Sequence, residues 1–489
     1  MNERVKKAID EYYNTFMWMN QSQYKHVLEV AEAKADSHQI DSMSREDLYS
    51  VIESIEPQMK DIWFKQLSRL NDKTALYYFF PQKIFPVRKN SKIIIKCRYK
   101  YQKLVGQFKA VISPYYNYSY NYGTEYRPQT VSAVGNGKEI LIPFVFPTED
   151  RYIVTLFEVD GDRETLFMTY SFYAVEDDLY SLQPYKADLH MHTTFSDGVE
   201  PPELVMTSVR ERGIDICAVT DHNNFQGSVE ARKKAHEMGL NLTVLLGEEY
   251  SMAYSPMHIV SLGTDSPVDR YYISHKLTED ERVKKIIDDN PELSCDKVAY
   301  ACTQVLLDEV KKKGGLTILA HPFWKPINPN GSRMDTPESL FVALASNRRF
   351  AGIKLVSGSP EGECNISSMQ AALAQDMLLQ YEGIPLTGIT DSHQYSIDPI
   401  CGNHFTIIFA RSRKTEDVLA ALKQGMCVAV EIINNRPMCY GYYRFVKFGN
   451  YLTNFYFPER DEKAMVEGIV AREKFLTSDI EIEKGDNFR

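Results

Sequence analysis

Strand-like and helix-like runs alternate along the chain from residue 187 onward, and this alternation constrains the fold more than any other feature. Short apolar runs with strand character recur there, separated by runs with helical spacing of apolar residues. Repeated strand–helix units predict a parallel sheet or barrel whose functional groups lie at the C-terminal ends of the strands. The strand-like runs are 187–192, 216–221, 242–249, 257–262, 316–321, 352–356, 384–390 and 405–409, and helix-like runs include 203–212, 228–238, 299–313, 367–379 and 415–425.

Two regions of different texture precede this part of the chain. Residues 1–74 carry apolar residues at three- and four-residue spacing, which predicts a helical segment. Residues 75–180 contain short aliphatic and aromatic runs separated by glycine, asparagine and aspartate, which predict a small β-sandwich-like domain. We therefore predict a third domain over 181–489, with a C-terminal helical extension packed on it.

Composition restricts the partners and the compartment. The net charge of −10 provides no basic field for a nucleic-acid polymer, although a local basic pocket for a small anion is compatible with it. Because the sequence has no long apolar run and no secretory signal, we predict a cytoplasmic protein that does not contact a membrane. The eight cysteines lack CxxC spacing, which favours reduced thiols over disulfides or a zinc ribbon.

The stretch 186–198, KADLHMHTTFSDG, carries the strongest chemical signal. Alternation along a strand would send the imidazoles of His190 and His192 to the same face. Asp197 follows in a Ser-Asp-Gly turn, and Asp221 and His222 end the next strand-like run. The stretch therefore predicts a metal site with nitrogen and oxygen ligands from neighbouring strand ends.

Further histidines and carboxylates occupy similar positions. A lone histidine at a strand end is usually a packing residue, whereas six histidines accompanied by carboxylates favour a multinuclear metal hydrolase. Imidazole and carboxylate ligands without thiolate suit zinc, manganese or iron rather than magnesium or calcium. The histidines are His190, His192, His222, His258, His321 and His393, and the carboxylates include Asp197, Glu248, Glu249 and Asp391.

Six short motifs occur in the order LHMHTTFSDG, AVTDHNN, GEE, MHIVSLG, LAHPFW and GITDSH. In this order they resemble the polymerase-and-histidinol-phosphatase (PHP) superfamily of metal-dependent phosphoesterases, over roughly residues 186–433. The resemblance implies a distorted (β/α)7 barrel. It also implies hydrolysis of a small phosphomonoester or phosphodiester by a hydroxide that bridges metals at a trinuclear site.

The resemblance further implies how nine ligands divide among three divalent metal ions. A first ion would be held by His190, His192, Asp391 and a bridging glutamate, for which Glu249 is favoured over Glu248. His258, His321 and the same glutamate would hold a second ion. A third would be held by His222, His393 and Asp197, which stands where many relatives have a histidine.

Other residues near these motifs have two readings each. Asp221 either orients His222 from behind or has a structural role at the strand end. Lys325 and Lys354 either attract an anionic substrate or form salt bridges at the barrel rim, and Lys354 stands where many relatives have a glutamate. His404 either faces the pocket or caps a strand. Glu248, if it is not the bridging residue, is expected to support the ligands from behind.

Two other functions stay open at this stage. The same metals could attack an amide, a carbamate or another carbonyl, because metal-activated water does not select phosphorus. Alternatively, the chain could be a non-catalytic sugar- or protein-binding module that uses the tyrosine-rich loop 115–126, although a packed loop is the commoner outcome for such a sequence. A small phosphorylated substrate is the expected partner, and a homo-oligomer stays open.

Overall fold

A computed structural model describes residues 77–486 apart from 99–101, 118–126, 256, 321–337, 347–349, 351 and most of 357–384, together with isolated positions before residue 77. The chain forms two compact units. One comprises Met1–Leu182 and Lys447–Arg489, and the other comprises Gln183–Val446. The predicted helical segment 1–74 lies almost entirely outside the described residues, as does most of the tyrosine-rich loop 115–126.

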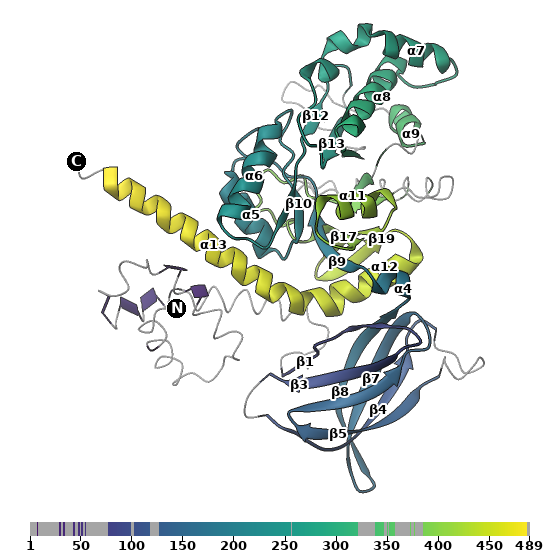
Figure 1. Cartoon of the computed structure of the whole chain (residues 1–489), viewed down its shortest axis with the longest axis vertical. Helices are drawn as coiled ribbons and strands as arrows, with labels where there is room; N and C mark the ends of the chain where they lie inside the picture. Colours follow the sequence, from purple (N-terminus) through teal and green to yellow (C-terminus); the bar gives the residue numbers. More distant parts are fainter. Residues whose placement is uncertain are drawn as a thin grey trace. The chain divides into compact units, whose positions relative to one another are not determined.

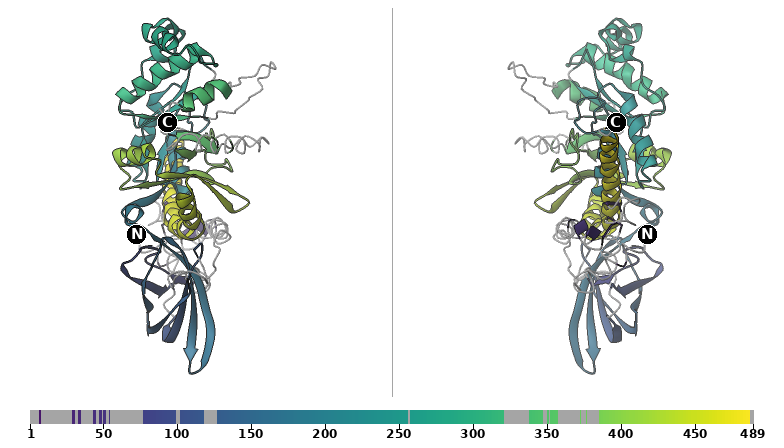
Figure 2. Two further views of the ribbon diagram at one scale, coloured as in Figure 1. Left: turned by 90° about the vertical axis from the view of Figure 1, so that its right-hand side faces the viewer. Right: turned by 90° about the vertical axis from the view of Figure 1, so that its left-hand side faces the viewer.

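The first unit contains one curled sheet of eight strands in the order β1-β3-β6-β5-β4-β7-β8-β2 (Figures 1 and 2). Side chains alternate between buried and exposed along β4, so that Phe108, Ala110 and Ile112 face the core enclosed by the sheet. The strands are β1 (Tyr78–Phe79), β2 (Ile84–Pro86), β3 (Asn90–Cys97), β4 (Leu104–Pro114), β5 (Gln129–Gly137), β6 (Glu139–Val145), β7 (Asp150–Asp160) and β8 (Arg163–Val175).

The predicted β-sandwich differs from this arrangement in one respect. The two halves of the sheet remain hydrogen-bonded to each other, because β5 and β6 are paired at Gly135 and Ile140. A Cβ atom at Gly135 would lie 2.4 Å from the Leu104 carbonyl oxygen, so only glycine permits this close approach. The strands therefore form one curled sheet instead of two stacked sheets.

The C-terminal segment belongs to the first unit, whereas the sequence assigned it to the domain over 181–489. It contains the end of α12 (Tyr443–Tyr451), a π-helical turn (Leu452–Tyr456) and the long helix α13 (Phe457–Asp486) (Figure 1). Glu459 of α13 lies 2.6 Å from Lys83 Nζ and accepts a hydrogen bond from the Tyr170 hydroxyl at 2.7 Å. These buried polar contacts join the helix to the sheet. The short helix α4 (Asp177–Tyr180) ends the N-terminal part of the unit.

The second unit is a mixed α/β domain with two sheets. One sheet has the order β11-β10-β9-β17-β18-β19 and the other β12-β13-β14-β15-β16. Strands β9 to β11 are parallel, as are β14 to β16, whereas β13 is antiparallel to β12 and β14, and β17 is antiparallel to β9 and β18. The expected parallel pairing is therefore present in part of each sheet.

Two isolated bridges connect these sheets. Met191 pairs with Ser392 just beyond β9, and His222 pairs with Glu249 just beyond β10. Residues of both sheets, including Ala187, Ile216 and Val260, pack in one apolar core. The strands are β9 (Gln183–Asp188), β10 (Ile216–Ala218), β11 (Thr243–Leu245), β12 (Glu249–Ser251), β13 (His258–Leu262), β14 (Leu316–Leu319), β15 (Gly352–Val356), β16 (Leu386–Gly388), β17 (His404–Ala410), β18 (Cys427–Ile433) and β19 (Arg436–Tyr440).

Helices cover the strands of the second unit. Several begin at side-chain caps, as at Asp296, whose carboxylate accepts hydrogen bonds from the first turn of α8. Among the described residues, no helix combines the length and apolar character that a membrane span requires. The helices are α5 (Pro202–Glu211), α6 (Phe225–Glu237), α7 (Glu281–Asp289), α8 (Lys297–Lys312), α9 (Glu338–Ser346) and α11 (Thr415–Lys423), with short 3₁₀ turns η3 (Arg270–Ile273) and η4 (His275–Glu279).

Candidate metal centre

His190 and His192 lie just beyond β9, in an extended segment instead of in the predicted strand over 187–192. His192 N donates to Ser392 O at 2.9 Å, and Asp391 N donates to His190 O at 2.8 Å. This pairing places Asp391 Oδ1 3.1 Å from Nε2 of both histidines. The two imidazole Nε2 atoms lie 3.2 Å apart. Two segments about two hundred residues apart in sequence thus supply one buried group of donors.

Glu249 lies at the centre of the site. This first residue of β12 is fully buried, and its Oε2 lies 3.1 Å from His190 Nε2 and 3.3 Å from His192 Nε2. The same oxygen lies 3.3 Å from His222 Nδ1, whereas Oε1 lies 3.2 Å from His258 Nδ1. Burial alone would raise the pKa of Glu249, but the surrounding imidazoles, His190 foremost, hold it well below its usual value.

Asp197 forms the exposed side of the site. Its Oδ2 lies 3.3 Å from His393 Nε2 and 3.6 Å from His222 Nε2, and its Oδ1 lies 3.6 Å from His192 Nδ1. Burial opposes ionisation of Asp197, but the hydrogen bond with His393 and the neighbouring imidazole charges lower its pKa. Its side chain is 54% exposed, so this side of the site is accessible to a ligand from solvent.

The structure brings together eight of the nine predicted ligands, which we call the donor cluster; His321 lies outside the described residues. Within it, three overlapping groups have donor atoms close enough to share a cation. Convergence of imidazole nitrogens on one buried carboxylate, at 3.1 to 3.3 Å, is the arrangement that a shared cation requires, so the donor set fits divalent metal ions. The groups are His190, His192, Glu249 and Asp391; His222, Glu249 and His258; and His192, Asp197, His222 and His393.

The carboxylate of Asp221 faces the turn before Asp197. It accepts hydrogen bonds from Thr193 N at 2.8 Å, from the Thr193 hydroxyl at 2.7 Å and from the Ser196 hydroxyl at 2.7 Å. These contacts hold the turn that carries Asp197, which agrees with the structural reading of Asp221. Helix α6 packs closely against this carboxylate, because a Cβ atom at Gly227 of α6 would lie 1.9 Å from Asp221 Oδ2.

Glu248 makes a different set of contacts from its neighbour Glu249. Its carboxylate lies 3.4 Å from Val268 N and 3.4 Å from a guanidinium nitrogen of Arg270. Burial raises its pKa, and the positive charge of Arg270 opposes this effect. Of the two glutamates, therefore, Glu249 is the one that lies among the imidazoles.

Two polar residues that belong to no motif in the sequence support the cluster. Asp188, the last residue of β9, accepts hydrogen bonds from Thr390 N at 3.0 Å and from the Thr390 hydroxyl at 2.7 Å. Burial raises its pKa to about 7. Ser251 lies with its hydroxyl 2.9 Å from His222 Nδ1. Its two-residue spacing from Glu249 in the strand was the available signal, because such residues share a face.

The predicted substrate-binding residues remain predictions. Lys325 lies outside the described residues, and Lys354 is a residue of β15 whose side chain is not described. His404 begins β17 opposite Glu431, and its Nε2 lies 3.6 Å from the Glu431 carboxylate. His404 is buried at the first position of this strand, which fits the reading in which it caps a strand.

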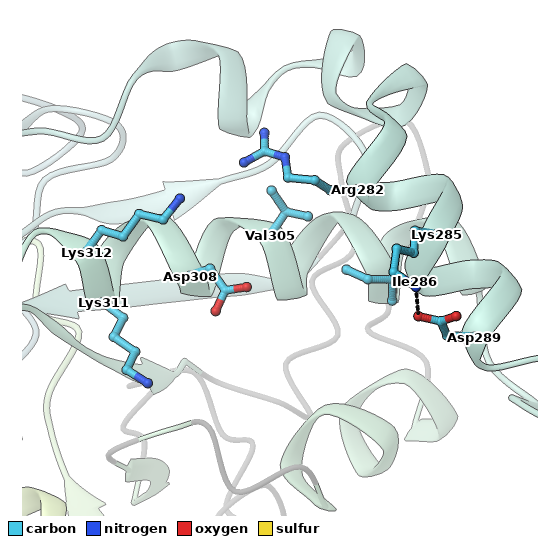
Figure 3. A pocket seen from close by; sticks show the side chains of 8 residues that line it. All are labelled: Arg282, Lys285, Ile286, Asp289, Val305, Asp308, Lys311 and Lys312. Atoms are coloured by element: carbon cyan, nitrogen blue, oxygen red, sulfur yellow. Dashed lines mark hydrogen bonds and ion pairs between the residues drawn. The ribbon is translucent and has the colours of Figure 1, made fainter.

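A surface groove of about 500 Å³ lies between α7 and α8 and contains none of the donor cluster (Figure 3). Ile286 and Val305 provide its apolar lining. Its charges are largely paired: Lys285 lies 2.8 Å from Asp289, and Arg282 lies 2.7 Å from Asp280 and 3.1 Å from Glu309. Because none of its lining residues belongs to the donor cluster, the groove is separate from the candidate metal centre.

Two curated relatives each match a short part of the chain. A 5'-3' exoribonuclease Rnm of Escherichia coli is 36% identical over 80 residues, which are 16% of this chain and 27% of that protein. A phosphoribosyl 1,2-cyclic phosphate 1,2-diphosphodiesterase of Eggerthella lenta is 35% identical over 83 residues, or 16% of this chain and 30% of that protein. The chain thus spans less than a third of either relative.

A solved structure and a protein family also match. The structure is a two-domain protein containing a predicted PHP-like metal-dependent phosphoesterase from Bacteroides vulgatus. It is 19% identical, with coverage of 51% of this chain and 65% of that chain and a TM-score of 0.35. Residues 188–310 match the PHP domain family, and this span includes His190, His222, Glu249 and His258. The similarity to the PHP domain family therefore covers residues 188–310, the part of the chain that carries these four of the described donor residues.

Proposed function

We propose that the chain is a metal-dependent phosphoesterase that hydrolyses a small phosphomonoester or phosphodiester. The observation that carries this proposal is the convergence of imidazole nitrogens on the buried Glu249 carboxylate, with Asp197 and His393 on the exposed side. A site made only for structural stability would have no need of an exposed side. The two relatives, which are named for phosphodiester hydrolysis, support phosphorus as the reacting centre.

We assign the ligands to three divalent cations, for which zinc, manganese and iron suit the mixed donors. His190, His192, Asp391 and Glu249 would hold the most buried ion. Glu249 and His258 would hold the second, together with the predicted ligand His321. Asp197, His222 and His393 would hold the third, at the exposed side.

The roles of the residues follow from their exposure and charge. Cations bound here would activate water and neutralise the phosphoryl oxygens during in-line displacement. Glu249 stays ionised and closed off from solvent, so it holds the assembly together and does not donate a proton to the leaving group. Asp197 and His393, 54% and 42% exposed, line the side at which substrate enters and the leaving group departs. Asp221 keeps Asp197 in place through the turn at Thr193 and Ser196.

A small substrate fits the charge of the protein better than a long nucleic acid does. The net charge of −10 opposes the approach of a polyanion, whereas a compact phosphate ester needs only the local positive charge of the metal site. We therefore propose a nucleotide, a sugar phosphate or a small cyclic phosphodiester as the substrate class.

A substrate screen on metal-loaded protein tests this proposal. The panel contains p-nitrophenyl phosphate, bis-p-nitrophenyl phosphate, nucleotides, sugar phosphates, a carbonyl ester and a 5'-labelled oligoribonucleotide. We expect turnover of at least one small phosphate ester, and loss of that turnover in a His192→Ala variant. Activity confined to the carbonyl ester or to the oligoribonucleotide would contradict the proposal, as would phosphate release that is equal in the variant.

A further inference from the structure

Ser251 lies between two imidazoles of the donor cluster. Its hydroxyl oxygen lies 2.9 Å from His222 Nδ1 and 3.4 Å from His258 Nε2. In each ring the other nitrogen faces a carboxylate: His222 Nε2 faces Asp197, and His258 Nδ1 faces Glu249. One hydroxyl thus contacts the rear of two candidate ligands.

The backbone of Ser251 is held on both sides. Asn223 Oδ1 accepts a hydrogen bond from Ser251 N at 3.2 Å, and Asn223 Nδ2 donates to Ser251 O at 3.1 Å. Asn223 has a φ of 48°, in a region that asparagine tolerates better than most residues. On the other side, Ser251 is the antiparallel partner of His258 in the pairing of β12 with β13. The hydroxyl therefore has a fixed location relative to both rings.

The position of His222 leaves its role ambiguous without this contact. Its Nδ1 lies 3.3 Å from Glu249 and its Nε2 lies 3.6 Å from Asp197, so the ring belongs to two of the three donor groups. A neutral imidazole that binds a cation through one nitrogen carries its proton on the other, and that N–H requires an acceptor. The Ser251 oxygen, at 2.9 Å, is nearer to Nδ1 than the Glu249 oxygen is.

We propose that Ser251 is a positioning residue that fixes the tautomers of His222 and His258. Its oxygen accepts from His222 Nδ1–H, which directs Nε2 to the group with Asp197 and His393. It also accepts from His258 Nε2–H, which directs Nδ1 to Glu249. A hydroxyl oxygen has two lone pairs, so it can accept both hydrogen bonds. This inference rests on the metal-binding part of the proposed function, but not on the identity of the substrate.

The tautomers can be measured directly on the wild-type chain. We expect ¹⁵N–¹H correlation spectra of ¹⁵N-histidine-labelled, zinc-loaded protein to show His222 protonated at Nδ1 and His258 protonated at Nε2. The variants His222→Gln and His258→Gln assign the two signals. The opposite tautomer at either residue would overturn the proposal.

Removal of the hydroxyl gives an independent measurement. We expect Ser251→Ala to bind zinc about 10- to 100-fold more weakly at the sites that contain His222 and His258, as is typical when the partner of a ligand is lost. Ser251→Thr, which keeps a hydroxyl, should restore most of the affinity. The matched control is Ser255→Ala, because the buried Ser255 hydroxyl accepts from Met257 N in the adjoining loop.

Calorimetric titration with zinc and elemental analysis provide these affinities and stoichiometries. Equal zinc affinity in Ser251→Ala and wild type would contradict the proposal, and so would an equal loss in Ser255→Ala. If Ser251→Ala fails to fold, the wild-type spectra still decide. Because neither measurement uses a substrate, a negative substrate screen would refute the proposed reaction and leave the role of Ser251 standing.

Discussion

At the scale of single residues, Glu249 belongs to two of the three groups of donor atoms. Its two oxygens face different imidazoles: Oε2 faces His190, His192 and His222, whereas Oε1 faces His258. A single carboxylate can therefore be shared by two cations. Its neighbour Glu248 is equally buried but contacts Val268 N and Arg270. The pair offers a matched comparison of one substitution at two adjacent positions.

Glu249→Gln keeps the size of the side chain but removes its charge and one acceptor oxygen. We expect metal affinity and hydrolysis to fall by more than about 100-fold, beyond the 10- to 100-fold loss typical of a group that only supports a ligand. Glu248→Gln should retain the full metal content. Elemental analysis and single-turnover assays compare the two variants, and an equal loss in both would contradict the central role of Glu249.

Metal binding should release protons at neutral pH. Burial alone would lower the pKa of His192, but hydrogen bonds with Asp391 and Glu249 raise it to about 10. The metal-free imidazole is therefore protonated at pH 7, and it must become neutral to bind a cation. Apparent affinity should rise with pH until the pH reaches this pKa. Calorimetry at pH 7 in two buffers of different ionisation enthalpy measures the released protons, and equal heats in both buffers would contradict the prediction.

The sequence predicted the candidate metal ligands better than it predicted the residues that hold those ligands in place. Histidines and carboxylates in six ordered motifs are uncommon together, so they indicated the cluster before its geometry was known. Asp188 is an ordinary polar residue whose role depends on Thr390, about two hundred residues away. Local sequence does not encode such a contact.

At the scale of elements, the strand that carries the first histidine pair ends earlier than its pattern predicts. Leu189 and Met191 are buried and alternate with the histidines, which is the pattern of a strand. The structure ends β9 at Asp188 and continues with a segment joined to Ser392 by one isolated bridge. Alternation of apolar and polar residues is the same in both cases, so the pattern cannot distinguish them. It also cannot reveal which strands pair antiparallel.

Helix α6 provides a test of the packing behind the cluster. Glycine inside a helix is less favourable than alanine by about 0.5–1 kcal/mol, so propensity alone predicts that Gly227→Ala stabilises the protein. The added Cβ would lie 1.9 Å from Asp221 Oδ2, and such overpacking typically costs about 1–3 kcal/mol. We expect the clash to dominate, with a lower free energy of unfolding and a displaced Asp197 turn. Denaturant unfolding measures the change.

The neighbouring substitution Gln226→Ala serves as the control, because Gln226 is an exposed residue of the same helix. It should change the free energy of unfolding by less than about 0.5 kcal/mol. If Gly227→Ala stabilises the protein as propensity predicts, the contact between α6 and Asp221 is not as close as the structure shows.

At the scale of the whole molecule, the composition of the first unit could not be predicted from local patterns. The helical character of the C-terminal segment was evident in the sequence, but its partner was not, because apolar helix faces fit many surfaces. The structure groups Lys447–Arg489 with Met1–Leu182. Polar contacts between residues nearly 400 positions apart in sequence, such as the ion pair of Lys83 and Glu459, join the C-terminal segment to this unit.

The pair of Lys83 and Glu459 tests this association. Both side chains are largely buried, at 6% and 13% exposure, so Glu459→Gln leaves the lysine charge without its carboxylate. Loss of one partner of a buried pair typically costs about 3–5 kcal/mol, and we expect a cost near the lower limit because Lys83 Nζ still donates to Phe455 O. Adding Lys83→Met should recover part of this cost. The exposed pair Lys89 and Asp177 is the control, and Asp177→Asn should change stability by less than about 0.5 kcal/mol.

Metal content distinguishes a local effect of Glu459→Gln from a general one. All the described donor residues lie within Gln183–Val446, so zinc stoichiometry at native conditions should be the same in the variant and in wild type. Denaturant unfolding of the two single variants and the double variant gives the coupling between Lys83 and Glu459. Additive effects of the two substitutions would show that Lys83 and Glu459 do not stabilise each other. A loss of zinc in Glu459→Gln would show that the effect of the substitution is not confined to the first unit.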